Sequence, residues 1–167
     1  AFMVFGMRWF EALNHMMTTV ATGGFSIWND SFGHYNNTHL QLVASVFMIL
    51  GACPFLSVMI SITNRSMMVF RDPQVQHLIL MTFSSALLVA GWRYYTILGQ
   101  DPVAILESSF FNIISIATTT GFSSDNYGLW GSFPVMIMCF LMFSGGASGS
   151  TSGGIKLFRY HLLFIFM

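Results

Sequence analysis

Charged residues are scarce in this sequence. Asp, Glu, Lys and Arg together make up 7% of its 167 residues, whereas 54% are hydrophobic. Soluble domains carry about 25% charged residues, so a water-facing surface of ordinary charge density is excluded. The six basic and six acidic residues balance, which leaves no net field to attract nucleic acid, and no nucleic-acid partner is predicted. We therefore expect membrane lipid to be the main solvent of this chain.

Cysteine is nearly absent, which argues against a disulfide framework and a cysteine-based metal cluster. The two cysteines, Cys53 and Cys139, lie inside apolar runs and are expected to be small core residues. The five histidines have spacings that match no standard zinc pattern. Among them, His15 is expected either to pack in the core or to be a hydrogen-bond partner within a short helix.

Two long apolar runs predict membrane-spanning helices. Residues 40–62 contain no charge, and as a helix they would extend about 35 Å, enough to cross a hydrocarbon core of about 30 Å. Pro54 predicts a kink in this inner helix. After a cytoplasmic loop at 63–75, residues 76–98 predict the outer helix of a following unit. Its one charge, Arg93, lies among aromatic residues and is expected to snorkel outward.

Two shorter apolar segments, residues 9–20 and 103–117, are too short to span a membrane. Each has a glutamate near its start and is followed by a polar stretch. Irregular backbone at membrane depth is tolerated only where it is buried in protein or lines water. We therefore predict a re-entrant pore helix with its loop within residues 8–30, and a second within residues 103–125.

Residues 131–167 are apolar but contain a run of glycine, serine and threonine at 145–154. Glycine and serine disfavour a helix, so this segment is predicted to be an inner helix broken near mid-membrane. The break should be buried in protein, because lipid leaves its N–H and C=O groups unsatisfied. Lys156, which follows the break, is expected to snorkel, or to tune ion passage at the edge of a gate.

The sequence contains an internal repeat. TTVATGGFS (residues 18–26) aligns with SIATTTGFS (residues 115–123) at an offset of 97 residues. Each copy predicts a unit of helix, pore loop and helix, as in many channels and transporters. Residues 1–7 are expected to be the end of an earlier membrane helix, and the apolar ends of the chain are expected to be cuts through membrane helices.

Basic residues predict the orientation of the chain. Arg65, Arg71, Lys156 and Arg159 belong in the cytoplasm by the positive-inside rule. The outer side then holds five acidic and two basic residues, a net charge of −3, which should attract cations.

The repeated polar segments have the residue types of a cation pore. Glycine reaches backbone conformations closed to other residues, and threonine adds a hydroxyl oxygen, so carbonyls on such backbone can replace the hydration shell of an ion. We predict ion-binding carbonyls in two filter segments: the first is Thr22, Gly23 and Gly24, and the second is Thr119, Thr120 and Gly121.

Four motifs occur in order along the chain. They are TVATGGFS (19–26), FRDPQVQ (70–76), IATTTGFSSDNYGLW (116–130) and GGASGSTSGGIK (145–156). Together they resemble the Trk/Ktr/HKT superfamily of potassium transporters, and within it the bacterial TrkH/TrkG type. The resemblance covers nearly the whole chain. It implies an all-α integral membrane fold of repeated helix, pore loop and helix units, potassium-channel-like, of which this chain holds two of an expected four.

The resemblance also implies a function. It predicts potassium uptake through the two filter segments, with K⁺ as the transported ion, no covalently bound cofactor and no enzymatic activity. A gate is predicted just below the filter, formed by Gly145, Gly146, Ala147, Ser148, Gly149, Ser150, Thr151, Ser152, Gly153 and Gly154. The family resemblance further implies a multi-pass protein of the bacterial inner membrane, a homodimer, and a cytosolic nucleotide-binding regulatory subunit similar to TrkA.

Two alternatives use the same residues. GASG at 146–149 fits the GxSG string of rhomboid-like intramembrane serine proteases, with Ser148 as nucleophile and His161 as base. The intervening residues would separate the two by about 20 Å in a helix, which disfavours a direct hydrogen bond. The other alternative is a non-conducting scaffold subunit.

Overall fold

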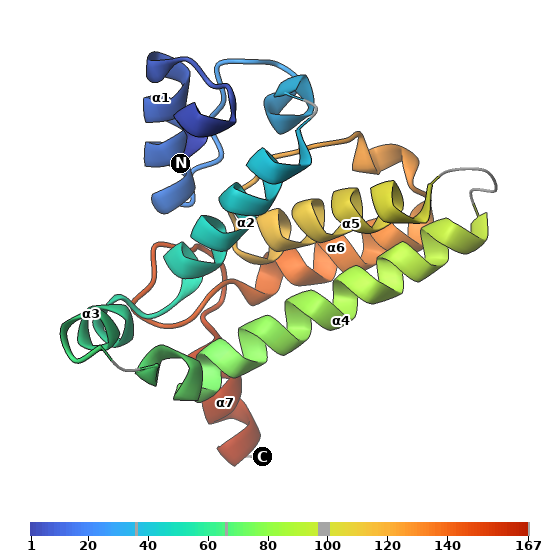
Figure 1. Ribbon diagram of the computed structural model, residues 1–167. Coiled ribbons are helices and arrows are strands. Elements are labelled where there is room, and N and C mark those ends of the chain that lie inside the picture. Colours follow the sequence, from blue (N-terminus) through green and yellow to red (C-terminus); the bar gives the residue numbers. More distant parts are fainter. Residues whose placement is uncertain (36, 66, 97–100, 167) are drawn as a thin grey trace.

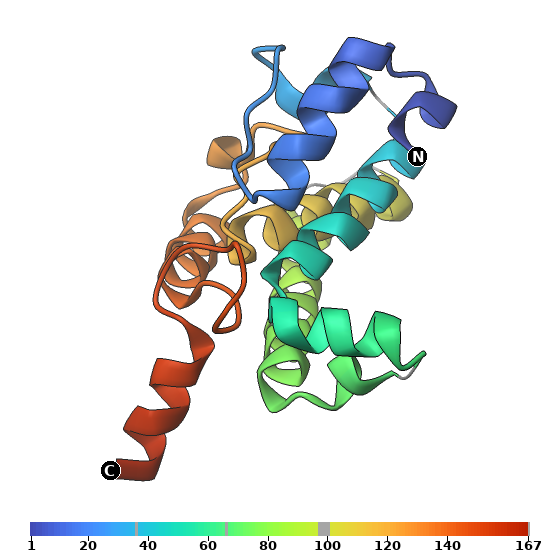
Figure 2. The ribbon, with the colours of Figure 1, turned by 90° about the vertical axis from the view of Figure 1, so that its left-hand side faces the viewer.

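The computed structural model describes residues 1–35, 37–65, 67–96 and 101–166, which form helices joined by loops, with no strand among them. The helices are η1 (Phe2–Phe5), α1 (Trp9–Val20), η2 (Ser31–Tyr35), α2 (Thr38–Ala52), α3 (Phe55–Thr63), η3 (Met68–Arg71), α4 (Pro73–Thr96), α5 (Pro102–Ala117), η4 (Tyr127–Leu129), α6 (Ser132–Ser144) and α7 (Leu157–Phe166), where η denotes a 3₁₀ helix. The helix α1 lies at one end of the molecule and α7 at the other (Figure 1 and Figure 2).

Small and branched side chains allow the central helices to pack closely. The long helix α4 runs beside α5 and α6 (Figure 1), and the three share a buried cluster that includes Ala86, Ile113 and Leu141. A second cluster around the fully buried Phe32 joins α2 to α5 and to Phe122 after the second filter segment. The core therefore surrounds the loops that follow α1 and α5.

One helix in the described part, α4, is long and apolar enough to cross a membrane by length and composition, and α2 with α3 would make a second if they count as one span. The start of α4 has a local capping contact, since the Gln74 N–H donates to Asp72 Oδ1 at 3.0 Å. The predicted outer helix at 76–98 corresponds to this element.

The inner helix predicted at 40–62, with a kink at Pro54, is two separate helices. The helices α2 and α3 meet at an angle of 106°, far more than a proline kink. The break leaves backbone groups without helical partners, and a distant segment supplies them: the Ala147 N–H donates to the Ala52 carbonyl at 3.0 Å, and the Phe55 N–H donates to the Gly149 carbonyl at 3.0 Å. Pro54 therefore starts the bend, and the 145–154 segment stabilises it.

Two smaller expectations concern residues 1–7 and the cysteines. Residues 1–7 contain only the short helix η1, which ends at Gly6 with a φ of 101°. Cys53 is buried, as expected, but Cys139 on α6 is exposed, because it points away from the face that α6 packs on its neighbours.

Candidate functional site

The two filter segments have the same backbone conformation. Thr22 and Thr119 have φ angles of 50° and 57°, and Gly24 and Gly121 have φ angles of 66° and 89°. A positive φ is rare for a β-branched residue, so the surrounding contacts must hold each threonine in place. The internal repeat thus extends from residue types to dihedral angles.

A side chain on the helix before each filter segment donates a hydrogen bond to the residue that follows that segment. The Thr18 hydroxyl on α1 donates to the Phe25 carbonyl at 3.0 Å, and the Ser115 hydroxyl on α5 donates to the Phe122 carbonyl at 2.7 Å. Both pairs are related by the repeat offset of 97 residues. Each filter segment is therefore held between the end of the preceding helix and a hydrogen-bonded residue, Phe25 in the first repeat and Phe122 in the second.

The two filter segments lie against each other. A Cβ atom added at Gly24 would lie 2.0 Å from the Thr120 carbonyl oxygen and 3.1 Å from the Gly121 carbonyl carbon. Real side chains never approach this closely, so only glycine fits between the segments. Gly23 and Gly121 are exposed, so part of this shared backbone remains accessible.

A buried polar residue behind each filter segment contacts a serine just after that segment: Ser26 in the first repeat, and Ser124, one residue beyond the equivalent position, in the second. On α1, His15 is fully buried; its Nδ1 donates to the Glu11 carbonyl at 2.8 Å, and its Nε2 lies 3.0 Å from the Ser26 hydroxyl, within hydrogen-bond distance. On α5, Asn112 occupies the equivalent position and donates to the Ser124 hydroxyl at 2.8 Å. His15 is therefore both a packed residue and a hydrogen-bond partner.

The helix η2, which follows the first filter segment, contacts the residues just after the second filter segment. The Phe32 N–H donates to the Ser123 carbonyl at 2.9 Å, and the Ser123 N–H donates to the Ser31 hydroxyl at 3.3 Å. The rings of Phe32 and Phe122 lie edge to face, with centroids 4.7 Å apart. These contacts join the two repeats on the side of the filter segments opposite the 145–154 segment.

The 145–154 segment, which we call the glycine-rich loop, contacts both repeats from the other side. The hydroxyls of Thr119 and Ser152 lie 3.0 Å apart, and the Gly153 N–H donates to the Thr119 hydroxyl at 2.6 Å. The Thr151 hydroxyl is 3.0 Å from the carbonyl of Val20, the last residue of α1. The loop therefore sits directly against the ends of the first pore helix and the second filter segment.

Contacts within the glycine-rich loop differ from one expectation. Ser152 Oγ accepts from the Gly146 N–H at 2.9 Å, which closes the loop on itself. Of the two expectations for Lys156, snorkelling differs from the structure: the ammonium folds back and donates to the carbonyls of Ser150, at 3.3 Å, and Ser152, while its predicted role in tuning ion passage stays a prediction. These carbonyls have left the helical ladder, and a charged donor satisfies them.

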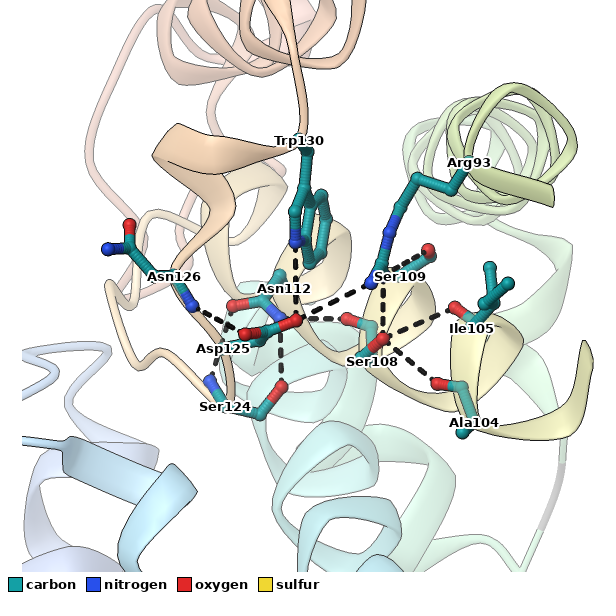
Figure 3. Close-up of polar contacts among 10 residues, drawn as sticks. All are labelled: Arg93, Ala104, Ile105, Ser108, Ser109, Asn112, Ser124, Asp125, Asn126 and Trp130. Atoms are coloured by element: carbon teal, nitrogen blue, oxygen red, sulfur yellow. Dashed lines mark hydrogen bonds and ion pairs between the residues drawn. The ribbon is translucent and has the colours of Figure 1, made fainter. Parts of the chain in front are cut away.

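The expected snorkelling of Arg93 is wrong. Its side chain points inward and is only 3% exposed. Its Nη1 donates to the hydroxyls of Ser108 at 2.7 Å and Ser109 at 3.1 Å, and its Nη2 lies 3.4 Å from Asp125 Oδ2 (Figure 3). The guanidinium also lies 3.9 Å from the centroid of Trp130. Sequence reasoning missed this network, although an arginine inside an apolar run is a signal for a buried partner.

The described residues contain no group of three or more His, Cys, Asp or Glu side chains that could hold a metal ion. The oxygens around the filter segments are instead backbone carbonyls and threonine hydroxyls, the ligand type suited to alkali cations. Ser148 is exposed in the glycine-rich loop, and the side chain of His161, its predicted base, lies outside the part that the structure describes. No protease site is assembled from described residues.

Comparison with known proteins identifies relatives along the whole chain. The TrkH family, described as cation transport protein, matches residues 4–165. The Trk system potassium uptake protein TrkI of Halomonas elongata is 38% identical over 168 residues, covering 100% of this chain and 34% of its own length. TrkH of Escherichia coli K12, also a Trk system potassium uptake protein, is 31% identical, covering 95% of this chain and 33% of its own length.

A solved structure shares the fold. The crystal structure of the potassium transporter TrkH from Vibrio parahaemolyticus superposes with a TM-score of 0.92 at 28% identity, covering 98% of this chain and 36% of that one. The chain thus spans about a third of the length of the relatives it matches. The names of these relatives refer to cation transport or potassium uptake, and none of them refers to an intramembrane protease. The chain belongs to the TrkH family of cation transport proteins.

Proposed function

We propose that this chain supplies two of four pore-lining sectors of a transporter that takes up K⁺ across the bacterial inner membrane. In this proposal the carbonyls of Thr22, Gly23 and Gly24, and of Thr119, Thr120 and Gly121, replace the hydration shell of the ion. The pore helices α1 and α5 end at the filter segments, so the partial negative charge of their C-terminal ends favours a cation there.

One observation carries the proposal. The two filter segments are 97 residues apart in the sequence, share their φ angles and hydrogen bonds, and meet so closely that Gly24 has no room for a side chain beside Thr120. An ordinary turn between two buried helices needs neither the duplication nor the shared location. Repeated carbonyl-rich backbone around one point is what a symmetric ion path requires.

The gate of this path is the glycine-rich loop. Its Thr151 and Ser152 side chains bond to the end of α1 and to Thr119, so moving the loop breaks contacts just below both filter segments. Backbone that has left the helical ladder changes conformation at low energy. The name of the relatives refers to a Trk system, and we propose a homodimer with a cytosolic nucleotide-binding regulatory subunit as its further parts.

The filter assignment is tested by replacing Gly121 with Leu in a full-length transporter that carries this sequence, expressed in bacteria that lack other K⁺ uptake. Collapse of K⁺ uptake, or loss of discrimination against Na⁺, is expected at unchanged membrane abundance. Unchanged uptake and discrimination would instead support the non-conducting scaffold.

The gate assignment is tested separately by deleting residues 145–154 and joining the ends with a short linker. Uptake that becomes leaky and independent of regulation is expected. Uptake that stays fully gated would show that the gate lies elsewhere.

A further inference from the structure

Arg93 connects three elements around the second filter segment. It projects from α4, contacts Ser108 and Ser109 in the first half of α5, and reaches Asp125 in the loop after the filter (Figure 3). It lies on the side of α5 that faces α4, away from the first repeat. The proposed ion path does not itself use this residue.

The burial of this arginine needs an explanation. A guanidinium removed from water is costly unless it is paired and hydrogen-bonded, and the Nε of Arg93 has no hydrogen-bond partner among the residues that the structure describes. Its acidic partner, Asp125, remains 48% exposed, so the pair is not sealed in the core. A hydrophobic residue could fill this space with less desolvation, so the geometry that Arg93 imposes is the better account of its presence.

The network fixes the position of Asp125. One carboxylate oxygen accepts from Arg93 Nη2 at 3.4 Å and from Trp130 Nε1 at 3.2 Å, and the other accepts from the Asn126 N–H at 2.8 Å. Asp125 is four residues beyond Gly121, the last residue of the second filter segment. Because Asp125 is held in place, the backbone between Gly121 and Asp125 can shift only a little.

The first repeat has a brace at the equivalent positions, built from different residues. By the offset of 97, Glu11 corresponds to Ser108 and Trp28 corresponds to Asp125. Tyr35 joins the pair: its hydroxyl donates to Glu11 Oε2 at 3.2 Å and accepts from Trp28 Nε1 at 3.1 Å. Burial raises the pKa of the Tyr35 phenol, so this hydroxyl stays protonated as a donor. Both repeats therefore link the start of the pore helix to the loop after the filter.

We infer that Arg93 is a positioning residue: acting through Asp125, it sets the spacing of the carbonyls in the second filter segment and thereby the preference for K⁺ over Na⁺. This inference rests on the proposed function of the filter segments. Arg93 does not touch the ion, so its removal should alter the discrimination between ions more than the capacity for flux.

The test uses the full-length transporter with Arg93→Gln, Asp125→Asn, both changes together, and Arg93→Lys. Uptake of K⁺ and Na⁺ is measured over a range of concentrations, and the membrane abundance of each variant is measured as well. The matched control is Arg71→Gln, which replaces an exposed arginine. We expect Arg93→Gln to lower K⁺ over Na⁺ discrimination by about tenfold, the effect of about 1.4 kcal/mol, through the KM for K⁺. The double variant should be no worse than either single variant, and Arg93→Lys should restore part of the discrimination.

The inference is wrong if Arg93→Gln and Asp125→Asn lower only abundance or maximal rate while discrimination stays unchanged. Should Arg93→Gln fail to reach the membrane, Asp125→Asn and Ser108→Ala decide the question by the same readout, since the first removes the charge that pairs with Arg93, the second removes one hydrogen bond, and both leave the arginine in place. A failure of the proposed function would look different: the unmodified transporter would not move K⁺, or Gly24→Leu would leave its uptake intact.

Discussion

The side-chain hydroxyls of Thr119 and Ser152 lie 3.0 Å apart, although 33 residues separate them in the sequence. Thr119 belongs to the second filter segment, and Ser152 belongs to the glycine-rich loop. A hydrogen bond between these two side chains thus joins the proposed selectivity element to the proposed gate. Because Thr119 also accepts from the Gly153 N–H, its hydroxyl is the point at which movement of the loop reaches the filter.

Removing this contact should loosen the gate. Thr119→Val keeps the branched shape but loses the hydroxyl, and Ser152→Ala loses the partner atom; a hydrogen bond contributes about 1 kcal/mol, so basal K⁺ uptake should rise by about fivefold in either variant. The double variant should be less than additive, because both changes remove one shared bond. Ser84→Ala, on the exposed face of α4, is the control for hydroxyl loss. Strictly additive effects would show that the two hydroxyls act independently.

Gly24→Ala should be far more damaging than an ordinary glycine substitution. Gly24 combines a φ of 66° with a Cβ position 2.0 Å from the Thr120 carbonyl oxygen, so the new methyl group must displace the second filter segment. We expect K⁺ uptake to fall by at least about tenfold, as a loss of about 1.4 kcal/mol of ion binding would produce. Gly91→Ala on α4 has open space at its Cβ and should leave uptake unchanged. Equal uptake in the two variants would argue against contact between the filter segments.

Ser115→Ala should destabilise the second filter segment. The Ser115 hydroxyl is fully buried and donates to the Phe122 carbonyl at 2.7 Å, so its removal leaves a buried acceptor without this partner, at a penalty of about 1–3 kcal/mol. The expected result is a lower thermal midpoint of the purified transporter, with partial protection when K⁺ is present. Thr18→Val in the first repeat removes the equivalent bond, which is more exposed, and should have a smaller effect. The reverse order of effects would contradict the burial argument.

Ser148→Ala should leave K⁺ uptake unchanged. The side chain is exposed, and the contact that anchors this part of the loop uses the backbone N–H of Ser148, which donates to Gln74 Oε1 at 2.8 Å. Gln74→Leu removes that acceptor and should increase basal flux, so the pair separates the role of the backbone from that of the side chain. A loss of transport with Ser148→Ala would reopen a chemical role for the hydroxyl.

Local sequence signals predicted much of the fold. The predicted short helices at 9–20 and 103–117 compare with α1 at Trp9–Val20 and α5 at Pro102–Ala117, and the predicted broken helix after residue 131 compares with α6 and α7. These elements depend on nearby features, such as uncharged runs, glycine clusters and the proline at position 102, which the chain carries within a few turns. The repeat offset of 97 residues also predicted equivalent positions for the two filter segments.

The errors fall where a residue depends on a distant partner. The aromatic neighbours of Arg93 predict an interfacial arginine. Its hydrogen-bond partners, however, are Ser108 and Asp125, which are 15 and 32 residues away in the sequence. Pro54 by itself predicts only a kink in one helix, not the bend of 106° between α2 and α3. Its full angle requires the glycine-rich loop, whose Thr151 N–H donates to the Gly51 carbonyl.

Composition and periodicity by themselves indicated a chain suited to a membrane, the two short helices that precede the filter segments, and which two segments repeat, because each of these follows from residues close together along the chain. Tertiary structure decided that the two filter segments meet, that the glycine-rich loop bonds to Thr119 and to the end of α1, and that Arg93 turns inward. Those outcomes depend on hydrogen bonds between groups up to 131 residues apart, whose formation depends on how the helices pack.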